Sequence, residues 1–510
     1  MSLAEYTHKM GVPDAKLSGF DYNKQRFSWT LLSADEMAYC INDVRGMVEA
    51  LKIEMALDHD DLYTIPLTST GYVRRDCKRA MEGFNHKQLL AMLPDLDCYM
   101  ALREAFRGGN THASRWYARD IITDVKSVDR SSSYPDVMVN CVFPMKAFHH
   151  EGAVSPERLK QLIWTREKAV LMRVAFFNIR EHDKYIGCPY LSRDKCRNIQ
   201  NGIFDNGRIL SADYLETTIT DIDFRIIIQM YDWDSMNAFD VWHARYGKLP
   251  QMLIDVVNHY YKLKTELKGD PDNELYYMKA KNKLNSLYGM SAQDPVKDSI
   301  DFIDGQFIPQ NKSVDELLRK SRRRAFLNYA WGVWVTAWAR YRLHEGIMAA
   351  GHNFVYCDTD SVKYIGEIDL TAFNEARIAD SKKNGAYAVD SKGVTHYMGV
   401  FEPEGQYEKF ATMGAKKYCY VEDGKLHITI AGVNKSKGAE ELGKIENFKE
   451  GFVFRKAGGT ESVYNDLIDI DYEVEGRTVR ITDNVVIRDS EYTLGLTEEY
   501  FRILEGCAEI

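Results

Sequence analysis

The sequence lacks the features that mark membrane, secreted and zinc-binding proteins. It contains no apolar run of 18 residues, which argues against a transmembrane helix, and its first residues, MSLAEYTHKM, have no apolar signal core. Its nine cysteines are an odd number and no two stand in CxxC spacing, so reduced thiols are favoured over a zinc site. Internal repeats and low-complexity tracts are also missing. We therefore expect a cytoplasmic globular protein with no membrane partner.

What is present is the ordinary composition of a globular protein. The 510 residues are 45% hydrophobic and 28% charged, enough for about two to four domains or one multi-lobed body. The net charge of −9 argues weakly against nucleic-acid binding, but Lys and Arg gather locally, at residues 319–324, 416–417 and 435–437. Taken singly, each cluster is more readily explained as a solvated face.

Periodicity and turn residues indicate a mixed α+β chain of packed lobes. Helical patterns occur at residues 33–58, 250–268, 273–290 and about 313–349. Ser33 and Glu36 form a capping box at the start of the first helix, and the second and third helices should make a helical hairpin. Strand and turn signals occur at residues 120–128, at Asp205-Asn206-Gly207, in a β-hairpin over 296–309 turning at Asp304-Gly305, and at Asp423-Gly424.

An apolar run followed by two acids, FVYCDTDS at residues 354–361, is the most informative stretch of the chain. The run suits a buried strand, and a turn after it would aim Asp358 and Asp360 at one point. Two carboxylates that close repel each other unless a cation neutralises them. Mg²⁺ is the simplest such cation, since it binds carboxylate and phosphate oxygens together. The alternative is a plain surface turn, because Asp and Thr are ordinary turn residues.

A second motif, KAKNKLNSLYG at residues 279–289, places three different side chains on one helix face. Lys281, Asn285 and Tyr288 stand at i, i+4 and i+7. The Lys can neutralise a triphosphate, the ring can stack on a base or sugar, and Gly289 lets a template strand approach the backbone. An exposed amphipathic helix with a Gly cap would explain the glycine, but not Asn285 and the serine after it, which are mildly unfavourable inside a helix.

A third motif, DRSSSYP at residues 129–135, combines an acid with a Ser-rich turn. Asp129 ends a strand, and the turn leads into Tyr134-Pro135. Such a turn exposes backbone N–H groups that can hold phosphate oxygens, so the two features together suit a metal–nucleotide complex. A plain strand-to-helix turn with Pro at its first helical position is the alternative.

With these three motifs in order, the sequence resembles the family B DNA polymerases, most of all their protein-primed bacteriophage branch. The family's patterns Dx₂SLYP, Kx₃NSxYG and YxDTDS correspond to residues 129–135, 281–289 and 356–361. Shorter similarities occur at Phe106-Arg-Gly-Gly109, at residues 332–340 and at Lys416-Lys-Tyr418. The resemblance therefore covers roughly residues 20–455.

The resemblance implies an α+β, right-hand polymerase fold with an antiparallel palm sheet, helical fingers, a thumb and two family-type insertions. The implied parts are an exonuclease remnant (1–60), a linker and first palm part (61–140), an insertion resembling terminal-protein region 1 (141–243), fingers (244–291), an insertion resembling terminal-protein region 2 (292–321), the second palm part (322–441) and a thumb (442–510).

The resemblance also implies a site for two-metal transfer of a nucleotide to a primer 3′-hydroxyl. The implied catalytic and metal-binding residues, for two Mg²⁺ ions or Mn²⁺ in their place, are Asp129, Asp358 and Asp360, with Asp360 the firmer of the last two. The incoming deoxynucleotide (dNTP) would be held by Arg130, Ser133, Tyr134, Lys264, Lys281, Asn285 and Tyr288, and Tyr134 would act as the steric gate against ribonucleotides. Primer–template DNA would contact Arg107, Gly108, Gly289, Thr359, Lys416 and Tyr418.

Two departures from the family pattern concern the first acid. The family's Leu before Tyr-Pro is Ser133 here, and a rival acid, Asp124, lies five residues upstream of Asp129 behind a more apolar strand. We prefer Asp129, because it alone has the family's spacing to Tyr134-Pro135.

The pattern Tyr39-x-x-x-Asp43 resembles the third exonuclease motif of the family, but no DxE pattern precedes it. Without those acids a two-metal hydrolytic site cannot assemble, so we expect no 3′→5′ exonuclease from this chain. The chain would then be a fragment, the product of a lineage that lost the domain, or an enzyme whose exonuclease is a separate subunit. One turn of an amphipathic helix is the plain explanation of both residues.

Several alternatives stay open on the sequence. The sequence does not distinguish priming by a terminal protein from priming by RNA or at a nick. It also does not determine processivity or strand displacement. A non-catalytic DNA-binding or replisome scaffold is disfavoured by the three retained acids, and a primase-like enzyme that makes RNA is disfavoured by Tyr134. If a phage encodes the chain, it would act in the host-cell cytoplasm.

Overall fold

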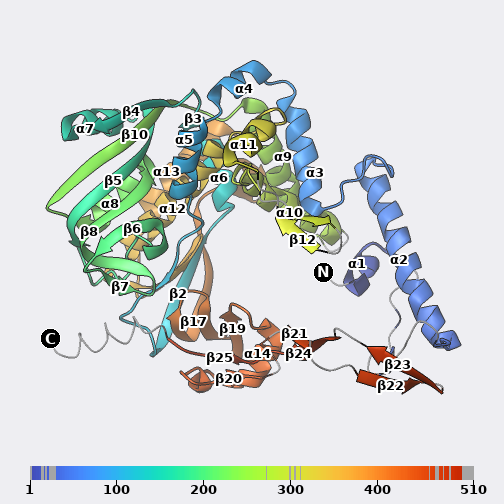
Figure 1. Cartoon of the computed structure of the whole chain (residues 1–510). Helices are drawn as coiled ribbons and strands as arrows, with labels where there is room; N and C mark the ends of the chain where they lie inside the picture. Colours follow the sequence, from blue (N-terminus) through green and yellow to red (C-terminus); the bar gives the residue numbers. More distant parts are fainter. Residues whose placement is uncertain are drawn as a thin grey trace.

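The computed structural model describes residues 3–12, 17, 20–21, 24, 30–270, 273–297, 300–303, 306–309, 312–455, 457–458, 460–465, 470–474, 476–481 and 484–496, and the elements named below lie within these ranges. Helices and antiparallel sheets are mixed along the chain, which confirms the predicted α+β class (Figure 1). No helix among these residues is both long and apolar enough to cross a membrane.

A seven-stranded antiparallel sheet carries the predicted acids, in the strand order β1-β13-β14-β2-β17-β18-β19. Its strands are β1 Thr111–Ala113, β2 Ile121–Arg130, β13 Phe354–Asp358, β14 Ser361–Ile365, β17 Phe401–Gly414, β18 Lys417–Glu422 and β19 Lys425–Ile430. Strand β13 is a continuous apolar run because both faces of the sheet are covered there: Phe354 and Cys357 join one hydrophobic cluster, and Val355 and Tyr356 join another. The predicted turn at Asp423-Gly424 joins β18 to β19, with φ of 50° and 69°.

A group of helices lies above this sheet in Figure 1. Helices α9 (Gln251–Glu266) and α10 (Glu274–Ser291) pack against each other and form the predicted helical hairpin, with α3 (Ser69–Met81) beside them. Strands β11 (Ile300–Ile303) and β12 (Gln306–Pro309) form the predicted β-hairpin, whose turn at Asp304-Gly305 lies outside the described residues. The remaining helices of this part are α4 His86–Met92, α5 Leu96–Ala105 and α6 Ser133–Asn140.

The prediction of a single helix over residues 313–349 is wrong. The segment forms two helices, α11 (Val314–Arg322) and α12 (Tyr329–Ala350). Asn328 interrupts it, because its side chain accepts the Ala330 N–H at 3.0 Å and donates to the Met92 carbonyl at 3.0 Å, so a buried cap replaces a helical turn. Helix α12 then runs through the core and passes so close to the end of α10 that a Cβ on Gly332 would lie 2.4 Å from the backbone of Ala292.

A second, eight-stranded antiparallel sheet occupies residues 143–247, at the left of Figure 1. Its order is β3-β10-β5-β8-β6, with β4 on β10, β7 on β8 and β9 on β5. The strands are β3 Phe143–Pro144, β4 His149–Val154, β5 Lys168–Glu181, β6 Cys196–Gln200, β7 Ile203–Asp205, β8 Arg208–Thr220, β9 Tyr231–Asp232 and β10 Ser235–Gly247. Assignment of this sheet to a terminal-protein region stays a prediction.

Two details of this sheet follow from local sequence. The predicted turn at Asp205-Asn206-Gly207 joins β7 to β8, with positive φ at Asn206 and Gly207. Strand β8 ends at Thr220, which forms a capping box with Asp223, and helix α8 (Asp221–Met230) begins there. Helix α7 (Pro156–Trp164) packs on β5 and β10.

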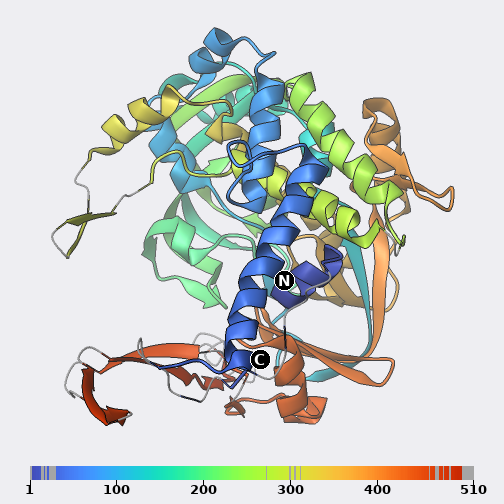
Figure 2. The same cartoon turned by 90° about the vertical axis from the view of Figure 1, so that its right-hand side faces the viewer.

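The described N-terminal segment lies beside α10, where Lys9 pairs with Glu274 and Asp58 pairs with Lys279. The predicted capping box of Ser33 and Glu36 is confirmed at the start of α2 (Ala34–Asp58), which crosses the front of Figure 2, with α1 (Leu3–Lys9) beside it. The C-terminal part packs on β18 and β19 around its own hydrophobic cluster. Its elements are α14 Lys435–Leu442, β20 Val453–Phe454, β21 Thr460–Asn465, β22 Ile470–Val474, β23 Arg477–Ile481, β24 Asn484–Asp489 and β25 Tyr492–Thr493. Between β14 and β17 the chain also forms α13 Thr371–Asn384, β15 Tyr387–Val389 and β16 Thr395–Tyr397.

Candidate polymerase active site

The two acids of the DTD motif lie on a tight turn between β13 and β14, which we call the catalytic turn (residues 358–360). Thr359 has φ of 60°, an uncommon conformation for a β-branched residue, and its N–H donates to the Asn110 carbonyl at 2.8 Å. The Asp360 N–H donates to the Asp358 carbonyl at 2.6 Å. The backbone is therefore held in a strained form that fixes where both carboxylates point.

Sheet register brings the third acid to the same place. Strands β14 and β2 pair Ser361 with Asp129, and the Arg130 N–H donates to the Asp360 carbonyl at 2.9 Å. The rival Asp124 lies toward the other end of β2, before Val125 and its partner Ile365, and accepts a hydrogen bond from Gln406. The structure therefore places Asp129, and not Asp124, beside Asp360.

The pKa values of these two carboxyls show how unfavourable their charge is in the bare protein. Burial raises the pKa of Asp129 to about 7, with further contributions from the charges of Asp360 and Glu404. Burial also raises the pKa of Asp360 to about 6; Arg130 opposes the rise, and Asp358 and Glu404 add to it. Neither carboxylate forms an ion pair with another residue in the part of the chain that the structure describes. Buried, clustered carboxylate oxygens are the ligands that Mg²⁺ prefers, so these residues fit a metal pair.

Asp358 differs from the other two acids because it already has a cation. The Lys416 ammonium lies 2.6 Å from its Oδ1, and the Thr111 and Thr359 hydroxyls donate to the same oxygen at 3.0 and 3.1 Å. Lys416 itself sits at a positive φ of 58°, and its N–H donates to the Tyr356 hydroxyl. Lys416, predicted to hold the primer end, therefore lies directly at the catalytic turn.

Tyr418, the tyrosine of the Lys416-Lys-Tyr418 similarity, packs against the strand that leads into the catalytic turn. Tyr418 lies on β18, and its ring centroid is 4.8 Å from that of Tyr356 and 5.5 Å from that of Phe410. Its predicted contact with primer DNA remains a prediction.

The predicted nucleotide residues come from α6, α9 and α10, except Arg130, which ends β2. The rings of Tyr134 and Tyr288 stack with centroids 3.7 Å apart and planes 13° apart, so the predicted gate on α6 contacts α10. Lys264 donates to the Ser132 hydroxyl at 3.1 Å. Its pKa is lowered by burial first and then by the charges of Lys268 and Lys281. The structure thus brings a tyrosine pair and two lysines to the motif that follows Asp129.

The stripe predicted on α10 faces outward. Lys281, Asn285 and Gly289 are exposed and Tyr288 is half-buried, while Ala280, Leu284 and Leu287 of the same helix are buried. Nothing lies within 4 Å of the position of a Cβ on Gly289, which leaves its backbone open to a ligand.

Three more of the predicted ligand-binding side chains, besides Lys264, Thr359 and Lys416, are engaged within the protein. The fully buried Arg130 guanidinium pairs with Asp136 at 2.7 Å and donates to the Ser133 hydroxyl at 2.9 Å. Arg107 donates to the Ala105 and Thr218 carbonyls and to the Thr217 hydroxyl, at 2.8 to 2.9 Å. The side chains of Arg107, Arg130 and Ser133 therefore stabilise the protein around the site. A direct contact of each with nucleotide or DNA stays a prediction.

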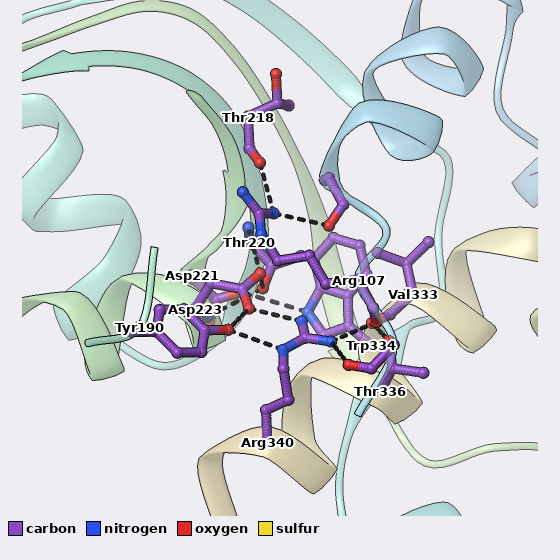
Figure 3. A network of polar contacts seen from close by, with 12 residues as sticks. Arg107, Tyr190, Thr218, Thr220, Asp221, Asp223, Val333, Trp334, Thr336 and Arg340 are labelled. Carbon is purple, nitrogen blue, oxygen red and sulfur yellow. Dashed lines mark hydrogen bonds and ion pairs between the residues drawn. The ribbon is translucent and has the colours of Figure 1, made fainter. Parts of the chain in front are cut away.

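A buried network of polar contacts joins Arg107 and α12 to the region of the second sheet (Figure 3). Arg340 of α12 pairs with Asp223 at 2.7 Å, donates to the Tyr190 hydroxyl at 2.8 Å and donates to the Gly108 carbonyl at 2.9 Å. Burial opposes ionisation of Asp223, but Arg340 and Arg107 outweigh it and lower its pKa to about 2. The network thus anchors the Gly108 backbone.

The next residue packs directly on the turn. A Cβ on Gly109 would lie 2.7 Å from the Thr359 hydroxyl oxygen, so only glycine allows the two segments to meet. Gly108, which the family resemblance implies as a DNA contact, is thus followed by a glycine that supports the catalytic turn.

Glu404 is a fourth acid at this site that the motifs did not reveal. A β-bulge between Pro403 and Gly405 leaves Glu404 as an extra residue in β17, and it affects the pKa of both Asp129 and Asp360. It accepts a hydrogen bond from Ser127 at 2.7 Å and lies 3.6 Å from the ammonium of the buried Lys363. An acid beside a proline in a strand is a weak signal, because only the register of β17 against β2 shows where it points.

The comparisons with known proteins agree with this geometry. A family model described as DNA polymerase type B, organellar and viral, matches residues 18–364. The DNA polymerase of Bacillus phage PZA is 23% identical over 448 residues, which are 85% of this chain and 71% of that protein. The DNA polymerase of Bacillus phage phi29 is 22% identical over 376 residues, 73% of this chain and 59% of that protein. The chain thus spans roughly six- to seven-tenths of the length of these relatives.

Solved structures show the same fold. Phi29 DNA polymerase complexed with primer-template DNA and incoming nucleotide substrates superposes with a TM-score of 0.69 at 19% identity, covering 97% of this chain and 78% of that one. An orthorhombic crystal form of phi29 DNA polymerase gives 0.68 at 18% identity, with the same coverage. This likeness confirms the predicted polymerase fold. Since the family model matches more than half of the sequence, the chain belongs to the type B DNA polymerases of organelles and viruses.

Proposed function

We propose that this chain adds deoxynucleotides to a primer 3′-hydroxyl under the direction of a template, by two-metal transfer of a nucleotide. The observation that carries the proposal is the meeting of Asp129 and Asp360 at one end of the β14–β2 pair, both with raised pKa values and neither with a paired cation among the described residues. Carboxyls held in this way are costly to the fold unless a metal uses them.

Asp129 and Asp360 would hold the metal ions, and Asp358 would act from the side through its pairing with Lys416. When bound, two Mg²⁺ ions, or Mn²⁺ in their place, lower the pKa of the attacking hydroxyl and stabilise the leaving pyrophosphate. Lys264 and Lys281 would neutralise the triphosphate of the incoming nucleotide and the charge that develops on it. Their approach to each other supports this role.

Tyr134 would exclude ribonucleotides by occupying the space of a ribose 2′-hydroxyl. Its stacking on Tyr288 supports the assignment, because a ring held at 3.7 Å by a second ring cannot easily turn away from an added oxygen. Asn285, which is exposed, and Tyr288, which is half-buried, would line the nascent base pair. The exposed Gly289 would let a template strand approach the backbone.

Primer–template DNA is the proposed macromolecular substrate. Lys416 lies at the catalytic turn, where a phosphate of the primer end would exchange with the Asp358 carboxylate as its partner. Such phosphate contacts position a nucleic acid without reading its sequence. A phage relative solved with primer-template DNA and nucleotides supports these partners, and the phage origin of the relatives supports action inside a host cell.

The finer features follow the family resemblance. We propose that the sheet at 143–247 contacts a terminal protein primer and that the β11–β12 hairpin aids strand displacement. We also propose that this chain alone has no 3′→5′ exonuclease, since no DxE pattern precedes Tyr39, and that any proofreading comes from another polypeptide or segment.

Primer extension by the purified chain tests the proposal. Wild type with Mg²⁺ and dNTPs should extend a primed template, and Asp360→Asn should abolish extension while leaving the unfolding temperature within a few degrees. Asp124→Asn removes an exposed charge from the same strand and should retain activity. A wild type that binds DNA without extending it would establish a scaffold instead, and equal use of ribo- and deoxyribonucleotides would establish a primase-like enzyme.

A further inference from the structure

Three side chains with metal-binding groups converge on the second sheet, outside the polymerase site. His149 and Glu151 lie on β4, and His243 lies on β10 directly opposite His149 in the register of the two strands. One ligand atom from each residue lies within 4.8 Å of the other two. His243 Nε2 is 2.7 Å from Glu151 Oε1, so these two groups already face each other. We propose that His149, Glu151 and His243 bind a first-row transition-metal ion, with Zn²⁺ preferred over the Mg²⁺ of the polymerase site.

The chemistry of the three groups favours zinc. Two imidazoles and one carboxylate are a recurrent Zn²⁺ ligand set, which leaves a fourth position for water, whereas Mg²⁺ prefers oxygen ligands alone. Ligand atoms around a tetrahedral zinc ion stand roughly 3.3 Å apart, given Zn–N and Zn–O bonds of about 2.0–2.2 Å. The present separations, 2.7 Å for the closest pair and no more than 4.8 Å for the widest, reach that value by small side-chain rotations.

The scaffold around the site is rigid. Strand β10 is hydrogen-bonded to β4 on one side and to β5 on the other, and His243 is buried with 9% of its side chain exposed. The register of β4 against β10 shifts at Glu151; His149 and Glu151 both lie beside His243, while the His150 ring stacks on Trp242. The ligands therefore come from two paired strands, and no loop has to be ordered when an ion binds.

The protonation states also suit a metal. Burial lowers the pKa of His243, although Glu151 opposes the shift, so the imidazole favours the neutral form that metals require. Hydrogen bonding from Arg158 is the main cause that lowers the pKa of Glu151, to about 2, so this carboxylate is ionised at neutral pH. Lys168 adds a positive charge near His243 and opposes a cation.

Arg158 is the group that a metal must compete with. It lies on α7 and binds both carboxylate oxygens of Glu151, through Nη2 at 2.6 Å and Nε at 3.0 Å. A metal on Glu151 Oε1 would displace the Nη2 contact, while Oε2 keeps the Nε contact and remains oriented by it. Bound zinc would then fasten β4 to β10, and through Arg158 to α7, as a structural ion of the second sheet.

Zinc titration of the untagged, EDTA-treated and dialysed chain tests the site. The Asp129→Asn/Asp360→Asn background removes the polymerase acids as alternative zinc ligands. Calorimetry should show one equivalent of bound Zn²⁺, and Co²⁺ in its place should give visible absorption bands of a four- or five-coordinate ion. His149→Ala and His243→Ala should each weaken zinc binding by at least about tenfold. His150→Ala is the matched control: this ring stacks on Trp242 and its loss should leave zinc affinity unchanged.

Replacing the competing arginine tests the site by a gain in zinc affinity, which a misfolded variant would not show. Arg158→Gln should tighten zinc binding because it frees Glu151, whereas Glu151→Gln should weaken it. Opposite changes in zinc affinity for these two variants are expected only if zinc binds at Glu151. The proposal is overturned if the parent protein binds no zinc at micromolar concentration, if the His149→Ala/His243→Ala variant binds it as tightly as the parent, or if Arg158→Gln weakens it.

Discussion

Replacing Asp129 with asparagine should remove DNA synthesis and, without metal, make the fold more stable. Burial raises the pKa of this carboxyl from 3.8 to about 7, with Asp360 and Glu404 adding to the rise. A difference of about three pKa units corresponds to at most about 4 kcal/mol of unfolding free energy, at about 1.4 kcal/mol per unit. Asparagine has nearly the same shape and cannot ionise, so it avoids this cost.

The sign of the pH dependence follows from the direction of the shift. Because the folded-state pKa is raised, the unfolded chain releases this proton first. The stability of the metal-free protein therefore falls as the pH rises from about 4 to about 7, and the full cost applies above pH 7. Asp360, whose pKa is raised to about 6, contributes over the lower part of the same range.

Thermal unfolding in EDTA at pH 5 and pH 8 measures the effect. Wild type should lose more stability between these pH values than Asp129→Asn, and Mg²⁺ at pH 8 should raise the unfolding temperature of wild type more than that of the variant. Asp124→Asn, on the same strand but exposed, should behave like wild type. If Asp129→Asn is less stable than wild type at pH 8 in EDTA, Asp129 is a stabilising charge in the bare protein and the argument for a metal-dependent carboxylate pair fails.

Three further variants test the supports of the site. Gly109→Ala should lower kcat about a hundredfold in primer extension, because its Cβ would lie 2.7 Å from the Thr359 side chain and a displacement of the catalytic turn by about 1 Å is enough for such a loss. Arg340→Met should cost about 3–5 kcal/mol in urea unfolding by leaving the buried Asp223 carboxylate unpaired, and adding Asp223→Asn should recover part of that loss. Tyr134→Val should lower the ratio of kcat/KM for deoxy- over ribonucleotides, and an unchanged ratio would remove its assignment as the gate.

Local sequence was sufficient wherever neighbouring residues alone decide the structure. The capping box at Ser33, the turn at Asp423-Gly424 and the α9–α10 hairpin follow from hydrogen bonds and φ angles within a few residues, and each was predicted and found. The break before α12 was missed, because Asn328 becomes a helix cap only when the distant Met92 carbonyl is there to receive its side chain.

The same distinction between local sequence and tertiary structure applies to the acids of the site. The motifs named Asp129, Asp358 and Asp360, because apolar strands ending in carboxylates are visible in the chain itself. Strand pairing decided that Asp129 rather than Asp124 meets Asp360, and a bulge in β17 brings Glu404 to the same place. A side-chain contact between distant residues pairs Lys416 with Asp358. Short segments of sequence were thus sufficient to identify the catalytic acids that the family resemblance implies. The charge balance of the site, and the His149–Glu151–His243 cluster, depend on contacts between residues far apart in the chain, which only the tertiary structure sets.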